Sequence, residues 1–77
     1  MKVTIYTTEF CTWCRRTKGF FKLHNVKYIE KDVGKDVKTA REMISKSDQQ
    51  GVPVIDIDGK IIVGFDESAL KKTLKLK

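Results

Sequence analysis

The stretch Val3-Thr4-Ile5-Tyr6-Thr7-Thr8-Glu9-Phe10-Cys11-Thr12-Trp13-Cys14 decides the fold, because a strand pattern changes there to a helix pattern. The β-branched and aromatic residues at 3–7 predict a strand. From about Thr12 to His24 the apolar spacing predicts a helix. The residues expected on the inner face of that helix are Thr17, Phe20, Phe21 and Leu23.

The middle of the chain predicts a further strand, a helix and a hairpin. Alternation over residues 26–33 predicts the strand, and Asp36 is the predicted N-cap of the helix. The dipeptide Asp58-Gly59, typical of a two-residue hairpin turn, joins short β-like runs at 54–57 and 60–63. The residues expected to face the core from the helix are Val37, Ala40, Met43 and Ile44.

A last helix is predicted to begin at Asp66, whose side chain can cap it. Its expected core-facing residues are Ala69, Leu70 and Leu74. The first two strands are joined through a helix, so they are expected to be parallel. The sequence therefore predicts a single α/β domain over residues 1–77. Its order is β-α-β-α-β-β-α, with a four-stranded mixed sheet flanked by helices.

Length and composition restrict the class of protein. The chain has 77 residues, of which 40% are hydrophobic and 34% charged, which argues against disorder, a coiled coil or a membrane protein. The net charge is +6, but lysines alternate with acidic residues, which is typical of a solvated surface rather than a nucleic-acid interface. The first residues lack the pattern of a signal peptide. We therefore expect a cytoplasmic monomer with no nucleic-acid or membrane partner.

The chemistry is concentrated in Cys11-Thr12-Trp13-Cys14, which contains both cysteines of the chain. Residues three apart in the first turn of a helix lie on one face, within the separation that a disulfide requires. A bridge that closes only four residues stabilises a fold by about 2 kcal/mol, against about 5 kcal/mol for a loop of a hundred residues. The pair is therefore better explained by reactivity than by stabilisation.

The position of Cys11 at the start of a helix favours its thiolate. There the sulfur can face unpaired backbone N–H groups, those of Trp13 and Cys14, and the positive end of the helix dipole. Both effects lower the pKa of a cysteine below the value of about 8.5 for a free thiol. Three cations follow in the first turns of the same helix: Arg15, Arg16 and Lys18. They indicate either a nearby anion or the exposed face of an amphipathic helix.

Zinc binding is the main alternative use of a C-x-x-C pair. A structural zinc site takes four ligands, and beyond the two cysteines this chain offers only His24, which we interpret as a helix-terminal residue. We therefore expect no metal site. An iron–sulfur cluster would need further ligands from a second chain or a small molecule.

Aromatic residues near the cysteines predict an apolar rim. Phe10, Trp13 and Phe65 are expected to surround the thiols. The other aromatic residues are assigned to the core, namely Phe20, Phe21 and Tyr28.

The order of these features resembles the glutaredoxin family over essentially the whole chain. The resemblance rests on the strand, C-x-x-C and helix, followed by Val52-Pro53, the hairpin and Val63-Gly64-Phe65-Asp66. It implies a thioredoxin fold and thiol–disulfide exchange, with Cys11 as the nucleophile and Cys14 as the resolving cysteine.

The same resemblance gives roles to Val52 and Pro53. It implies that the backbone of Val52 pairs with a bound peptide or glutathione. It also matches Pro53 to a cis-proline beside the active site, whereas the general preference of X-Pro bonds favours the trans form.

Several positions depart from the glutathione-using members of the resembled family. Those members carry a lysine three residues before the nucleophile, Pro-Tyr between the cysteines, Thr before Val-Pro, and Gly-Gly before a small residue and Asp. The corresponding residues here are Thr8, Thr12-Trp13, Gly51 and Val63-Gly64-Phe65. Without that lysine, the chain lacks a cation that would bind a carboxylate of glutathione. Val63 and Phe65 are also expected to add bulk to the groove that binds the substrate.

Gly64-Phe65 instead resembles redoxins that reduce ribonucleotide reductase and take electrons from a thioredoxin reductase. Their fuller Trp-Ser-Gly-Phe-Arg-Pro signature is not present. The electron donor is therefore either a thioredoxin-reductase-like flavoprotein or glutathione, and no tightly bound cofactor is expected.

The sequence thus predicts a dithiol–disulfide oxidoreductase, an electron carrier that reduces protein or low-molecular-weight disulfides through Cys11 and Cys14. The residues expected to contact the substrate are Thr12, Trp13, Val52, Pro53, Gly64, Phe65 and Asp66. Asp66 is expected either to cap the last helix, which is the favoured role, or to hold an amino group of the ligand. The alternative function is a dimeric iron–sulfur carrier in which Cys11 and two glutathiones ligate a cluster. Visible colour in protein prepared without oxygen distinguishes the carrier from a simple dithiol redoxin.

Overall fold

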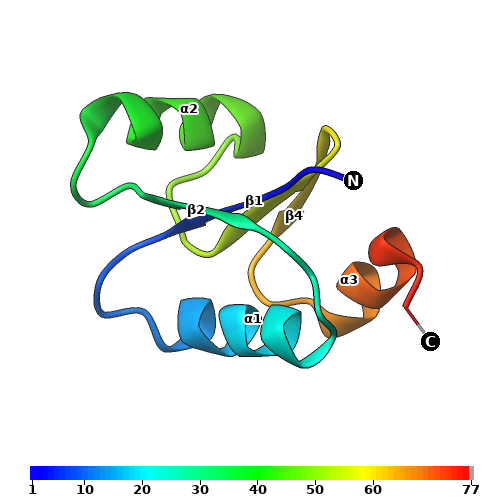
Figure 1. Cartoon of the computed structure of the whole chain (residues 1–77). Coiled ribbons are helices and arrows are strands. Elements are labelled where there is room, and N and C mark those ends of the chain that lie inside the picture. Colours follow the sequence, from blue (N-terminus) through cyan, green and yellow to red (C-terminus); the bar gives the residue numbers. More distant parts are fainter. Residues whose placement is uncertain (77) are drawn as a thin grey trace.

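The computed structural model describes residues 1–76, in which the elements follow the predicted β-α-β-α-β-β-α order (Figure 1). The elements are β1 (Val3–Thr7), α1 (Thr12–Leu23), β2 (Ile29–Asp32), α2 (Val37–Ser47), β3 (Val54–Ile57), β4 (Lys60–Val63) and α3 (Glu67–Leu74). The second strand is shorter than the predicted 26–33, because the chain joins the sheet only at Ile29. Within the described residues, none of the helices has the length and hydropathy needed to cross a bilayer.

The four strands form one mixed sheet in the order β2-β1-β3-β4. The central strand β1 is parallel to β2, with Thr4 opposite Ile29, and antiparallel to β3, with Ile5 opposite Ile55. All five residues of β1 are buried, as expected for a strand covered on both faces. The predicted parallel pairing and mixed sheet are confirmed.

Helices cover both faces of the sheet: Figure 1 shows α2 on one side and α1 with α3 on the other. Successive side chains of β1 point to opposite faces, so Ile5 and Tyr6 belong to different halves of the core. The larger half consists of Val3, Ile5, Phe20, Phe21, Ile55, Ile57, Ile62 and Leu70. The smaller half, under α2, consists of Tyr6, Met43 and Val54.

Local capping and turn chemistry agree with the sequence. Asp36 accepts a hydrogen bond from the Lys38 amide, and Asp66 accepts one from the Ala69 amide at 3.0 Å. At the hairpin Asp58 and Gly59 both have positive φ, 50° and 94°, which a two-residue turn of this kind requires.

The prediction for the inner face of α1 was wrong at its last residue. Leu23 is 77% exposed, whereas the buried stripe of the helix runs through Cys14, Thr17, Phe20 and Phe21. Leu23 lies outside this stripe at 3.6 residues per turn, and His24 packs against Phe20 instead, with ring centroids 4.5 Å apart.

The inner face of α2 was also predicted too broadly. Val37 is 68% and Ile44 39% exposed, and only Met43 is buried. Glu42 and Lys46 face the sheet beside Met43, where they form ion pairs with Lys31 and Asp56, and Ile44 lies toward solvent.

Substitution of Met43 tests this orientation of α2. Met43→Ala is expected to lower the free energy of unfolding by about 2 to 5 kcal/mol, because it leaves a cavity in the smaller half of the core. Ile44→Ala removes a side chain that is already partly in water, so this variant is expected to lower the free energy of unfolding by about 1 kcal/mol or less. Urea unfolding measures both values, and equal losses would contradict the orientation.

Candidate active site

Cys11 is the N-cap of α1, at the carboxyl end of β1. Its backbone is extended, with φ −114° and ψ 107°, and its Sγ accepts a hydrogen bond of 3.0 Å from the backbone N–H of Cys14. Of the two predicted donors, Cys14 makes this bond, and Trp13 makes none to Cys11 among the described residues. The sulfur thus occupies the position at which a helix accepts an anion.

The two cysteines form a disulfide, with their Cα atoms 5.2 Å apart, within the range expected from their spacing. They differ in accessibility, since Cys14 is 1% exposed and Cys11 is partly exposed. A reagent from solution therefore reaches Cys11 first, and Cys14 reacts through Cys11.

The three cations after the cysteines have different contacts. The guanidinium of Arg16 lies 5.1 Å from the centroid of the Trp13 ring, and Arg15 is exposed. Lys18 pairs with Glu30 of β2 at 2.9 Å, and the hydroxyl of Thr7 donates to the same carboxylate at 2.8 Å. The hydrogen bond from Lys18, aided by Thr7, lowers the pKa of Glu30 despite partial desolvation. Lys18 therefore helps to hold α1 on the sheet.

A cavity of about 220 Å³ lies beside the cysteine motif. Its lining residues are Trp13, Val52, Pro53, Gly64 and Phe65, all of which were predicted to contact a substrate. The rings of Trp13 and Phe65 lie 6.3 Å apart on this cavity, which we call the groove.

Backbone contacts join the two loops that form the groove. The Gly64 N–H donates to the carbonyl of Pro53 at 2.8 Å. The Val52–Pro53 bond is cis, as the family resemblance implies and against the general preference for trans. Neither backbone hydrogen-bonding group of Val52 has a partner within residues 1–76. An incoming extended chain can pair with that edge.

The remaining predicted contact residues lie outside the groove. Thr12 is exposed at the first position of α1, and Asp66 caps α3. Phe10 is 87% exposed and does not line the groove, so the predicted rim of three aromatic residues is reduced to Trp13 and Phe65. The sequence did not indicate that the buried ring of Phe20 packs edge-on against Phe65, with centroids 5.8 Å apart.

Comparison with known proteins identifies the family of this chain. The sequence model of the Glutaredoxin family matches residues 3–62. An uncharacterized glutaredoxin-like 8.6 kDa protein in a rubredoxin operon of Clostridium pasteurianum is 44% identical over 73 residues, or 95% of this chain and 97% of that protein. The chain belongs to the glutaredoxin family.

Two further relatives agree with this membership. Glutaredoxin 3 of Escherichia coli K12 is 35% identical over 65 residues, which cover 84% of this chain and 78% of that protein. The crystal structure of a thioredoxin-like protein, solved as a T8A mutant, superimposes with a TM-score of 0.93 at 32% identity, over 99% of this chain and 97% of that one. The predicted thioredoxin fold and redox-active dithiol centre are thereby confirmed.

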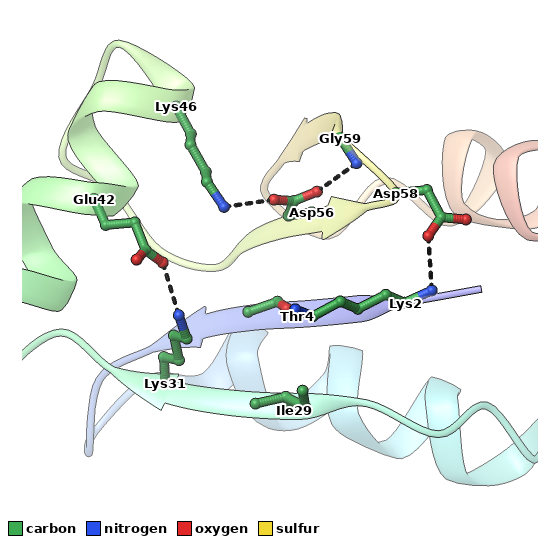
Figure 2. A pocket seen from close by; sticks show the side chains of 9 residues that line it. All are labelled: Lys2, Thr4, Ile29, Lys31, Glu42, Lys46, Asp56, Asp58 and Gly59. Carbon is green, nitrogen blue, oxygen red and sulfur yellow. Dashed lines mark hydrogen bonds and ion pairs between the residues drawn. The ribbon is translucent and has the colours of Figure 1, made fainter.

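A second cavity of this glutaredoxin-family protein, of about 470 Å³, lies between α2 and the sheet and runs from Lys2 to Lys31 (Figure 2). Figure 2 shows its charged side chains paired across the gap between α2 and the sheet, Lys31 with Glu42 at 2.9 Å and Lys46 with Asp56 at 2.7 Å. None of its lining residues is a cysteine or belongs to the groove. We therefore assign these charges to holding α2 on the sheet.

The ion pairs shift the titration of the groups that make them. The hydrogen bond from Lys46 lowers the pKa of Asp56, and the same bond raises the pKa of Lys46. Burial raises the pKa of the Tyr6 hydroxyl, and so does its hydrogen bond to Glu42. The pKa shifts of Asp56 and Lys46 favour the charged forms that pair between α2 and the sheet, whereas the pKa shift of Tyr6 favours its neutral hydroxyl.

Asp56 is expected to contribute stability that depends on pH. Its pKa is lower in the folded than in the unfolded chain, so the contribution is present above the unfolded value of about 3.9 and is lost as pH falls through the folded value. Asp56→Asn is expected to lower the free energy of unfolding by about 1 kcal/mol at pH 7, and progressively less below about pH 4. The loss is small because the Lys46 partner is partly solvated. Urea unfolding from pH 7 to pH 2 measures this difference.

The matched control is Asp48→Asn, which removes an exposed carboxylate at the end of α2. Asp48 has a positive φ, which asparagine also tolerates. The control is expected to leave the stability profile unchanged. A difference between wild type and Asp56→Asn that stays constant with pH would contradict the assignment.

Proposed function

We propose that this protein is a thiol–disulfide oxidoreductase that acts through the dithiol form of Cys11 and Cys14. The observation that supports it most directly is the unequal pair of sulfurs at the start of α1. Cys11 is accessible and accepts the Cys14 N–H, whereas the Cys14 side chain is buried behind it. This arrangement supports the proposal that Cys11 attacks the substrate and that Cys14 releases the product.

The reaction consists of two exchanges at sulfur. The Cys11 thiolate attacks one sulfur of the substrate disulfide, which forms a mixed disulfide and releases the other substrate sulfur as a thiolate that takes a proton from water. Cys14 then loses its proton and attacks Cys11, which releases the second substrate thiol and leaves the Cys11–Cys14 disulfide. Two electrons have passed from the protein to the substrate.

The groove supports an extended substrate segment beside Cys11. The unpaired backbone edge of Val52 offers one N–H and one C=O to such a segment, in the manner of strand addition. The side chain next to the substrate disulfide would pack against the apolar lining of the groove, which includes Trp13, Gly64 and Phe65. We also propose that Thr12, which is exposed at the start of α1, contacts the substrate, while Asp66 acts through its cap of α3.

The electron donor in this proposal is a thioredoxin-reductase-like flavoprotein, with glutathione as the second candidate. Thr8 offers no cation to a glutathione carboxylate, and the ring of Phe65 takes up space in the groove. Val63, which was expected to add bulk there, does not line the groove. Return of the disulfide to the dithiol requires a reducing compartment, so we place the protein in the cytoplasm. We also propose that it acts as a monomer without a tightly bound cofactor.

Serine variants of the two cysteines test the mechanism in an assay of NADPH consumption. Wild-type protein is expected to consume NADPH with thioredoxin reductase and insulin. Cys11→Ser is expected to lose turnover completely, because the nucleophile is absent. Cys14→Ser is expected to keep only turnover driven by glutathione and glutathione reductase, since glutathione in solution can replace the resolving thiol.

Insulin or glutathione-disulfide reduction by Cys11→Ser would refute the roles of the cysteines. Turnover of wild type with glutathione reductase alone would move the donor to glutathione. Visible absorbance of wild-type protein prepared without oxygen would support the iron–sulfur carrier instead.

A further inference from the structure

The side chain of Gln49 hydrogen-bonds to the backbone of Gly51, in the segment that leads from α2 to the groove. We call this pair of hydrogen bonds the Gln49 brace. The Oε1 of Gln49 accepts the Gly51 N–H at 2.6 Å, and its Nε2 donates to the Gly51 carbonyl at 3.0 Å. One carboxamide thus satisfies both backbone groups of the residue that directly precedes Val52.

The brace is anchored in the last turn of α2. The Nε2 of Gln49 also donates to the hydroxyl of Ser47 at 3.1 Å, and that hydroxyl donates to the Met43 carbonyl at 2.7 Å. The same turn is held to β3 by the pair of Lys46 with Asp56 (Figure 2). Gln49 therefore connects a fixed helix end to the backbone beside the groove.

Gly51 has no side chain at the point where Gln49 lies closest. A Cβ on Gly51 would lie 2.8 Å from Oε1 of Gln49, so the carboxamide would have to leave its place. The backbone of Gly51 is outside the left-handed region, so its conformation does not itself require glycine. The glycine instead leaves room for the brace.

We propose that Gln49 is a positioning residue that holds the Gly51 backbone and thereby sets where the unpaired edge of Val52 stands beside the disulfide. This inference rests on the proposed function. Pro53 is buried and is joined to Gly64, so the chain after Val52 is already fixed. The Gln49 brace fixes the chain before Val52, and the substrate then meets an edge that needs no further ordering.

Replacement of Gln49 is expected to weaken substrate binding without changing the chemistry of the cysteines. In insulin reduction, Gln49→Ala is expected to raise KM by about three- to tenfold, the size expected for one net hydrogen bond, with kcat unchanged. The reduction potential of the Cys11–Cys14 pair is expected to stay the same. Gln50→Ala is the matched control, since Gln50 is the exposed neighbour, and both KM and kcat are expected to stay at the wild-type values.

Gly51→Ala provides the second test, because it displaces the carboxamide while Gln49 is still present. It is expected to raise KM as much as Gln49→Ala does, and the double variant is expected to be no worse than either single variant, because all three lack the same brace. An unchanged KM in Gln49→Ala, or fully additive effects in the double variant, would overturn the inference alone. Wild-type protein that fails to reduce insulin would overturn the proposed function and the role of the brace together.

Discussion

The hydrogen bond from the Cys14 amide to the Cys11 sulfur is the interaction on which the proposed reactivity of this protein depends. It exists because α1 begins directly after Cys11, four residues beyond the end of β1 at Thr7, so the sulfur occupies the position of a helix cap. A thiolate accepts this bond more strongly than a thiol does, and the helix dipole acts in the same direction. In the proposed function, these backbone groups favour the thiolate of Cys11.

The groove and the α2 face of the sheet have separate roles. The groove is formed by Trp13, the Val52–Pro53 loop and the Gly64–Phe65 loop, beside the cysteine motif. Under α2 the apolar half of the core is smaller than under α1, and ion pairs between α2 and the sheet add to it. The loop after α2 connects this face to the groove, because the helix held by Lys46 is also the anchor of the Gln49 brace.

Local chemistry allowed much of the fold and site to be predicted from the sequence. The caps at Asp36 and Asp66 and the turn at Asp58-Gly59 depend on neighbouring residues only, and the structure confirms them. The exposure of Leu23 follows from helical spacing, which takes it off the stripe through Cys14, Thr17, Phe20 and Phe21. The exposure of Ile44 was not predictable, because the orientation of α2 depends on contacts with distant strands. The reason for Gly51 was likewise hidden, since the space that it leaves is filled by a side chain two residues away.

The pKa of Cys11 in the reduced Cys14→Ser variant tests the central claim most directly. This variant keeps the backbone N–H at position 14 and leaves one thiol to titrate. The rate of alkylation by iodoacetamide between pH 4 and pH 10 follows the thiolate fraction. We expect a midpoint well below the value of about 8.5 for a free cysteine. A midpoint at or above that value would show that the start of α1 does not activate the sulfur, and would contradict the proposed role of Cys11.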